Sequence, residues 1–265
     1  MNINIARDAR PQARTLLVAA AITFVLWLIP FADLLTYPFR IFVTFIHEGG
    51  HALAALLTGN SVAGLSVSMN TEGLTYTSQG SLFSQVFVSS AGYVGAMAYG
   101  ALLLFLIRRA VAARIVLVSS AAFILVLTLV YGLLVPLFNG TWGMMTGIPF
   151  TLVAGIVLAA GLVAIAKYAS ARVATFFMSF LAVQCVLNAL LNLKDLFFLS
   201  SPFGPTVQTD AVNMEQATHV PAMFWTLAWA GVAFVILSLA LRAYAVSRDK
   251  ATEQQDLPFE EPLEV

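Results

Sequence analysis

Charged residues are scarce in this chain, and cysteine is almost absent. Aspartate, glutamate, lysine and arginine together make up 10% of the 265 residues, whereas soluble domains carry about 25%. The formal net charge is zero, so the composition gives no sign of a nucleic-acid partner. Cys185 is the only cysteine, which excludes a disulfide within the chain. Hydrophobic residues make up 60% of the sequence, and this composition predicts a polytopic membrane protein.

Long apolar runs follow one another along most of the chain. A helix needs about 20 apolar residues to cross the hydrocarbon core of a bilayer. Pro30, Asp33 and Pro38 interrupt the first region, so residues 15–58 cross the membrane either twice or only once. We therefore expect an all-α polytopic membrane protein with six to seven transmembrane helices, the candidate spans being 15–33, 37–58, 82–107, 114–137, 147–167, 173–198 and 222–245.

The two ends of the chain differ from this apolar body. Residues 1–14 form a basic N-terminal segment, and the apolar stretch after it predicts an anchor helix that is not cleaved. Residues 247–265 are rich in aspartate and glutamate, which predicts a disordered acidic tail. Residues 15–246 are expected to form a single transmembrane domain, since no repeat and no soluble domain interrupts them.

Ionisable residues interrupt one of the apolar runs, at His47-Glu48-Gly49-Gly50-His51. Such side chains are costly at membrane depth, so their presence there indicates function. Residues four apart share a face of a helix, and the imidazoles of His47 and His51 can therefore bind one metal ion. Glu48 is placed to take a proton from water at that metal. The pattern predicts zinc hydrolase chemistry within a bilayer; the alternative is a set of core residues satisfied by polar neighbours.

A catalytic zinc site takes a third protein ligand besides water. If the spans alternate in direction, helix 173–198 ends on the same side as the helix that bears the histidines. Asp195 is the carboxylate of that helix, and it is our first candidate for the third ligand. Asp210, Glu215 and His219 lie on the same side in the loop 199–221, and Asp210 is either a ligand or the N-cap of the residues that follow it.

Two further features lie near these candidates. Residues 61–77 alternate apolar and polar side chains around a turn, which predicts a short interfacial β-hairpin directly after the histidine helix. An open strand edge cannot face lipid, and next to the site it could pair with an extended peptide. Asn188 and Asn192 lie one turn apart on helix 173–198. They are candidates for hydrogen bonds to a substrate, with interhelical packing as the alternative.

Together these segments resemble the M50 metallopeptidases of the site-2 protease type, and most closely the compact bacterial M50B-like branch. The resemblance rests on the histidine motif, the hairpin after it, the small-residue segment 91–95, residues 192–195 and the segment 209–225. It implies an intramembrane zinc metalloprotease that is itself a multi-pass protein of a bacterial cell membrane. His47, His51 and Asp195 would be the Zn²⁺ ligands, Glu48 the catalytic base, and a transmembrane protein in the lipid bilayer the substrate. The rival functions are an inactive scaffold or chaperone of the same fold and an ion- or proton-coupled transporter.

The orientation in the membrane stays open at the level of sequence. Most arginines and lysines fall on the side opposite to the hairpin, and the positive-inside rule assigns that side to the cytoplasm. The family resemblance instead suggests a zinc site that opens nearer the cytoplasm. The N-terminal arginines join the other basic loops only if residues 15–58 cross the membrane once.

Overall fold

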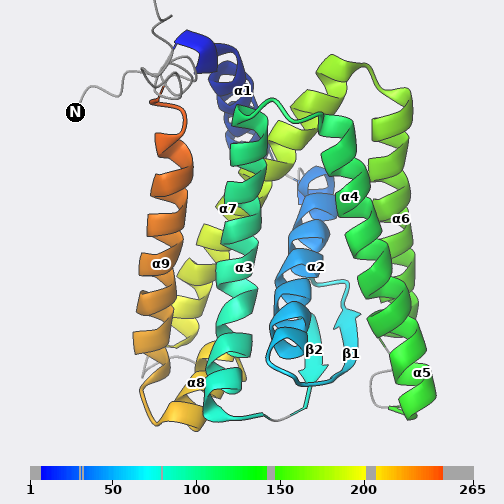
Figure 1. The fold of residues 1–265 in the computed structure, drawn as a ribbon, viewed down its shortest axis with the longest axis vertical. Helices are drawn as coiled ribbons and strands as arrows, with labels where there is room; N and C mark the ends of the chain where they lie inside the picture. Colours follow the sequence, from blue (N-terminus) through cyan, green and yellow to red (C-terminus); the bar gives the residue numbers. More distant parts are fainter. Residues whose placement is uncertain are drawn as a thin grey trace, which may run out of the picture.

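A computed structural model describes residues 7–29, 31, 33–78, 80–141, 147–200 and 207–246, so the predicted acidic tail lies outside the described residues. Long helices stand side by side in a bundle, and one small hairpin packs among them (Figure 1). In chain order the elements are η1 (Arg7–Ala9), α1 (Arg10–Leu28), α2 (Asp33–Leu57), β1 (Val62–Val67), β2 (Gly73–Thr77), α3 (Leu82–Arg108), α4 (Ala113–Val126), the π-helix η2 (Leu127–Leu134), α5 (Val135–Asn139), α6 (Ile148–Tyr168), α7 (Ala171–Leu199), α8 (Asp210–Thr218) and α9 (Ala222–Arg242).

Five helical stretches of the described chain are long and apolar enough to cross a membrane. They are α3, the continuous helix Ala113–Asn139 made of α4, η2 and α5, and the helices α6, α7 and α9. The chain is therefore a multi-pass membrane protein, as its composition predicts. The apolar runs at 15–33 and 37–58 also become helices, as α1 and α2, but neither is among these five.

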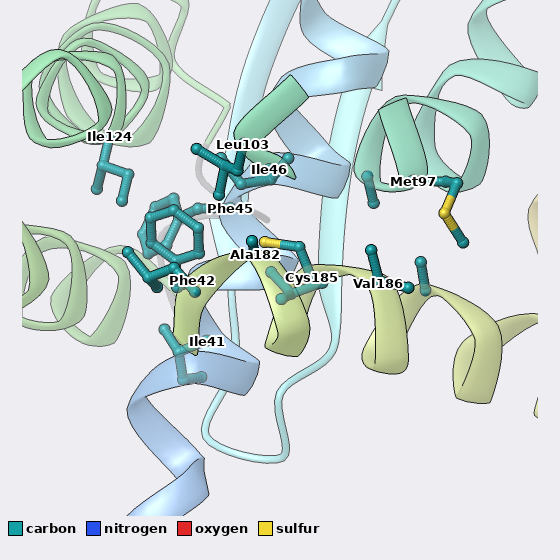
Figure 2. Close-up of a cluster of buried hydrophobic side chains, with 14 of the residues drawn as sticks. Ile41, Phe42, Phe45, Ile46, Met97, Leu103, Ile124, Ala182, Cys185 and Val186 are labelled. Carbon is teal, nitrogen blue, oxygen red and sulfur yellow. The ribbon is translucent and has the colours of Figure 1, made fainter. Parts of the chain in front are cut away.

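The core of the bundle surrounds α2. Ile41, Phe42, Phe45 and Ile46 lie on one side of this helix and are buried, because positions three and four apart share a face. In Figure 2 they meet Leu103 of α3, Ile124 of α4 and Ala182 with Cys185 of α7. Between helices in a membrane, such close van der Waals packing is a main source of association. It fixes α2, the helix that bears the histidines, at the centre of the protein.

Arg108 links three distant parts of the chain at one end of the bundle. Its guanidinium is buried at the end of α3, donates to Asp8 Oδ2 at 2.8 Å, and also donates to the carbonyls of Ala243 at 2.9 Å and Val246 at 2.8 Å. The start of α1 and the ends of α3 and α9 therefore lie together, at the top of Figure 1. We call this the basic end, because the helix termini there carry Arg10, Arg14, Arg108, Arg109, Arg114, Lys167, Arg172 and Arg242.

The opposite end holds α8 and the end of α2, and we call it the α8 end (Figure 1). Because η1 lies at the basic end and α2 finishes at the α8 end, α1 and α2 together carry the chain through the bundle once.

The two strands predicted within residues 61–77 form, and they fold back along α2. β1 and β2 pair antiparallel, with Leu65 opposite Thr75. The turn between them is held against the middle of α2, where the Tyr37 hydroxyl donates to the Met69 carbonyl at 2.7 Å and the Thr44 hydroxyl donates to the Thr71 carbonyl at 2.7 Å. β1 is thus packed against α2, η2, α5 and α6, while the outer edge of β2 pairs with no strand among the described residues.

Candidate metal centre

The two histidines meet on the buried face of α2, one helical turn apart. Their Nε2 atoms lie 3.1 Å from each other, and the rings stand edge to face. The Nδ1 of His51 lies 2.7 Å from the carbonyl oxygen of Val88 on α3, and as an N–H it donates to that oxygen. This bond leaves Nε2 free as a lone-pair donor, which is the usual arrangement of a metal-binding histidine.

Asp210, at the first residue of α8, is the third group at this point. Its Oδ2 lies 3.4 Å from the Nε2 of His47 and 3.3 Å from the Nε2 of His51. Ligands bound to zinc at about 2.0–2.1 Å in a tetrahedron are separated by about 3.3 Å. The three donor atoms therefore already have the spacing that one tetrahedral cation requires, and the residues present fit a zinc ion.

The structure does not bring Asp195, the first candidate for the third ligand, into this cluster. Its side chain is 62% exposed and forms an ion pair with the neighbouring Lys194 at 2.9 Å. The buried face of α7 at this level runs through Leu193 and Leu196. Asp195 reaches the expected end of the bundle but stands on another face of the helix. Asp210, the alternative from the loop, takes the place expected for Asp195.

Asp210 is available to the histidines because Thr209 caps the helix instead. The Thr209 hydroxyl accepts from the Val212 N–H at 3.3 Å, so the aspartate is not needed as the N-cap. Burial alone would raise the pKa of the Asp210 carboxyl, but the neighbouring imidazoles outweigh this effect and lower its pKa below the usual value. Asp210 is thus ionised, as a metal ligand must be. Glu215, another candidate from this region, instead accepts from the Ala222 N–H at the start of α9.

Glu48 lies beside the histidines and is held by the hairpin. It is buried, and its ligand atom belongs to a group with those of His47 and His51 in which all lie within 4.8 Å of one another. The Thr75 hydroxyl donates to Glu48 Oε2 at 2.7 Å, while Gly73 gives the carboxylate room, since a Cβ there would lie 2.4 Å from Oε1. Asp210 Oδ2 thus lies within 3.4 Å of both imidazoles, while the Glu48 carboxylate beside them is bound by Thr75.

Several glycines let helices approach this site. A Cβ on Gly92 of α3 would lie 2.4 Å from the Nε2 atoms of both histidines. Within the motif, a Cβ on Gly50 would lie 2.3 Å from the Ala91 carbonyl oxygen, and one on Gly49 would lie 2.7 Å from the Phe123 ring. The two motif glycines thus allow α3 and α4 to pack closely on α2.

Aromatic residues complete the surroundings of the histidines, although nothing in their sequence pattern beyond apolar character marked them as part of a site. The Tyr93 ring stands edge to face with the His47 ring at 4.6 Å between centroids and stacks on Trp229 at 5.5 Å. The indole of Trp229 donates to the Ser90 hydroxyl at 2.9 Å. This chain of contacts fixes the orientation of His47 from α3 and α9.

The two asparagines of α7 have different surroundings. The Asn188 amide donates to the Gln184 carbonyl at 2.8 Å, and the Gln184 side chain donates to the Thr23 hydroxyl of α1 at 2.9 Å. Asn188 also donates to Gln184 Oε1 at 3.2 Å, so it is tied within α7 to the side chain that contacts α1. Asn192 is exposed, and it keeps its place as a candidate for contact with a substrate.

Comparison with known proteins points in the same direction as this geometry. A family model described as Peptidase M50B-like matches residues 16–240, which include every residue of the cluster. No curated protein and no solved structure matches the chain.

Proposed function

We propose that this chain, which belongs to the Peptidase M50B-like family, is an intramembrane zinc metalloprotease that cleaves membrane-spanning protein segments. The observation that supports it best is the set of three donor atoms of His47, His51 and Asp210, spaced 3.1–3.4 Å apart, with a buried carboxylate beside them. A transporter would use buried ionisable groups along a path, whereas these groups converge on a single point. An inactive scaffold would have no need for Glu48 and its hydrogen bond from Thr75.

The residues divide the chemistry between them. Zinc held by His47, His51 and Asp210 would supply Lewis acidity and lower the pKa of water at the site. Glu48 would accept the proton of the attacking water and return it to the leaving amine, as a general base and then a general acid. The hydroxyl of Thr75 orients this carboxylate. The carbonyl oxygen of Val88 accepts from the ring N–H of His51 and fixes the orientation of that ring.

The free edge of β2 offers a place for the substrate backbone. Ser68 N donates to the Glu72 carbonyl at 2.8 Å. Along an antiparallel pair, residues whose backbone groups bond to the partner strand alternate with residues whose groups point away from it. Counted from Glu72, the N–H and C=O groups of Gly73 and Thr75 therefore point away from β1. The same two residues border Glu48. An unwound substrate segment that adds to this edge as a strand would bring its peptide bonds to the catalytic carboxylate.

The test of the protease function is the substitution Glu48→Gln in the full-length protein. We expect the variant to keep its zinc and its fold and to lose cleavage, because only the proton acceptor changes. Candidate substrates would first be identified as single-span membrane proteins that photo-crosslink to this variant. Each would then be epitope-tagged and co-expressed with the wild type or the variant to measure cleavage. Glu72→Gln, on the hairpin turn, is the matched control and should cut normally. Unchanged cutting by the Glu48→Gln variant would refute the proposal.

The sidedness of the site is a further part of this proposal. We infer six crossings with α1 and α2 counted as one, because Asp8 meets Arg108 at the basic end and α2 ends at the α8 end. Eight arginines and lysines mark the basic end as cytoplasmic under the positive-inside rule. Arg40 and Lys194 lie away from this end and contact Thr71 and Asp195. The α8 end, and with it the approach to Asp210, would then face away from the cytoplasm.

Cysteine labelling tests this orientation without requiring any activity. The natural Cys185 is fully buried, so wild-type protein provides an unlabelled background. Gln216→Cys on α8 and Ala112→Cys between α3 and α4 are exposed positions at opposite ends. A membrane-impermeant maleimide should label Gln216→Cys in intact cells and Ala112→Cys only after permeabilisation. The reverse pattern would place the site toward the cytoplasm.

A further inference from the structure

An open groove lies between α1 and α7 at the basic end, away from the metal centre. Its volume is about 500 Å³, and it is lined by Arg14, Thr15 and Val18 of α1 and by Ala171, Arg172, Thr175 and Phe176 of α7. Both helices begin at this end of the bundle (Figure 1). Their N-termini therefore add a positive potential to the same region as the two arginines.

The two arginines of this groove are the groups available to an anion. Both are exposed, and neither forms a hydrogen bond or ion pair within the described residues. The hydroxyls of Thr15 and Thr175 already donate to carbonyls of their own helices. Among the residues that the structure describes, no acidic one lines the groove. Arginine presents a planar fork of donors that matches a phosphate.

The groove has the same order of side chains on both helices. Val18 follows Arg14 by one helical turn, and Phe176 follows Arg172 by one turn, so each helix places an apolar side chain deeper in the bundle than its arginine. A free phosphate ion would need only the arginines. A phospholipid needs both parts, because its phosphate lies at the interface and its acyl chains lie below it.

We propose that the groove between α1 and α7 binds an acidic phospholipid, with Arg14 and Arg172 on its phosphate and Val18 and Phe176 against its acyl chains. Basic pockets between transmembrane helices on the cytoplasmic side are suited to such headgroups. A lipid bound there would contact both α1 and α7 nearer the basic end than the Thr23–Gln184 hydrogen bond, which connects the same two helices deeper in the bundle.

Native mass spectrometry of the delipidated full-length protein in detergent tests this site. The probes are phosphatidylglycerol, phosphatidylcholine with the same acyl chains, and glycerol phosphate without chains. We expect wild-type protein to retain phosphatidylglycerol in preference to phosphatidylcholine. The double variant Arg14→Gln with Arg172→Gln should bind phosphatidylglycerol about 30-fold more weakly, since each basic residue near an anionic lipid contributes about fivefold.

The control is Arg109→Gln with Arg242→Gln, which removes the same charge from the same end but not from the groove. It should retain phosphatidylglycerol close to the wild-type level, because neither arginine lines the groove. Val18→Trp fills the groove while both arginines remain, and it should also lower retention. Equal loss in the control pair, undiminished retention in Val18→Trp, or displacement of the lipid by glycerol phosphate would each overturn the proposal.

Discussion

Replacing Gly92 with alanine should remove zinc from the site although no proposed ligand is changed. The added Cβ would lie 2.4 Å from the Nε2 atoms of both His47 and His51. Ordinary contact begins near 3.4 Å, so each imidazole would have to retreat by about 1 Å. Metal sites tolerate deviations of about 0.2 Å in ligand distance. The displacement therefore exceeds the tolerance several times over.

The expected magnitude follows from this comparison. Changes in the outer shell of zinc sites cost about 10- to 100-fold in metal affinity, and a methyl group between the two donor atoms should cost at least the upper figure. Zinc affinity would be measured by competition with a chromophoric chelator, and zinc content by elemental analysis of the purified protein. Circular dichroism and the thermal unfolding midpoint would confirm that the helices are intact.

Gly95→Ala is the matched control on the same helix. A Cβ at this position would lie 3.6 Å from the Cα of Gly50, which is ordinary van der Waals contact. This variant should bind zinc as the wild type does. If Gly92→Ala also bound zinc with wild-type affinity, the histidine Nε2 atoms would not be the metal-binding atoms, and the proposed site would be wrong.

Three other predictions test separate contacts. Asp210→Asn should lower zinc affinity by at least about 100-fold, beyond the usual effect of an outer-shell change, whereas Asp195→Asn should leave it unchanged; the opposite result would restore the ligand expected first. Thr75→Val should slow cleavage by about tenfold with zinc retained, and Thr75→Ser should restore the rate, because the hydroxyl orients Glu48; equal rates in both variants would exclude that role. Arg108→Gln should cost about 1–3 kcal/mol of stability, since it removes the buried guanidinium that donates to Asp8 and to the carbonyls of Ala243 and Val246, and an unchanged unfolding midpoint in detergent would contradict this.

The sequence predicted the elements well because each has a local signal. Apolar runs of membrane length became helices, and the alternating residues 61–77 became β1 and β2. His47 and His51 could be paired from spacing alone, since four residues make one helical turn. These predictions need no knowledge of which helices are neighbours.

The third ligand required more than local signals. Counting crossings placed Asp195 at the correct end of α7, but it said nothing of the direction around the helix axis. That direction is fixed by packing, which buries Leu193 and Leu196 and leaves Asp195 exposed. Asp210 had a detectable signal, because the preceding Thr209 could serve as the cap and release the aspartate. Where two adjacent residues can both cap a helix, the one left over is the better candidate for a site.

The glycines of the motif show a second limit of local reasoning. The sequence places Gly49 and Gly50 within the motif, but only the structure shows that they lie against Phe123 and the Ala91 carbonyl. Their function is to bring α4 and α3 close to α2, and Gly92 in turn brings α3 to the histidines. Such roles depend on the neighbours of a helix, which the period of its own residues does not specify.

The path of residues 7–57 is the last step that the sequence left open. Hydropathy identifies two apolar runs there, but it cannot tell whether the second reverses the first or continues it. The ion pair between Asp8 and Arg108 favours continuation, because it holds the start of α1 beside the end of α3. With one net passage through the bundle, the N-terminal arginines join the other basic residues at a single end. The charge distribution then has one consistent interpretation, in which the histidines and Asp210 are approached from the end that carries little positive charge.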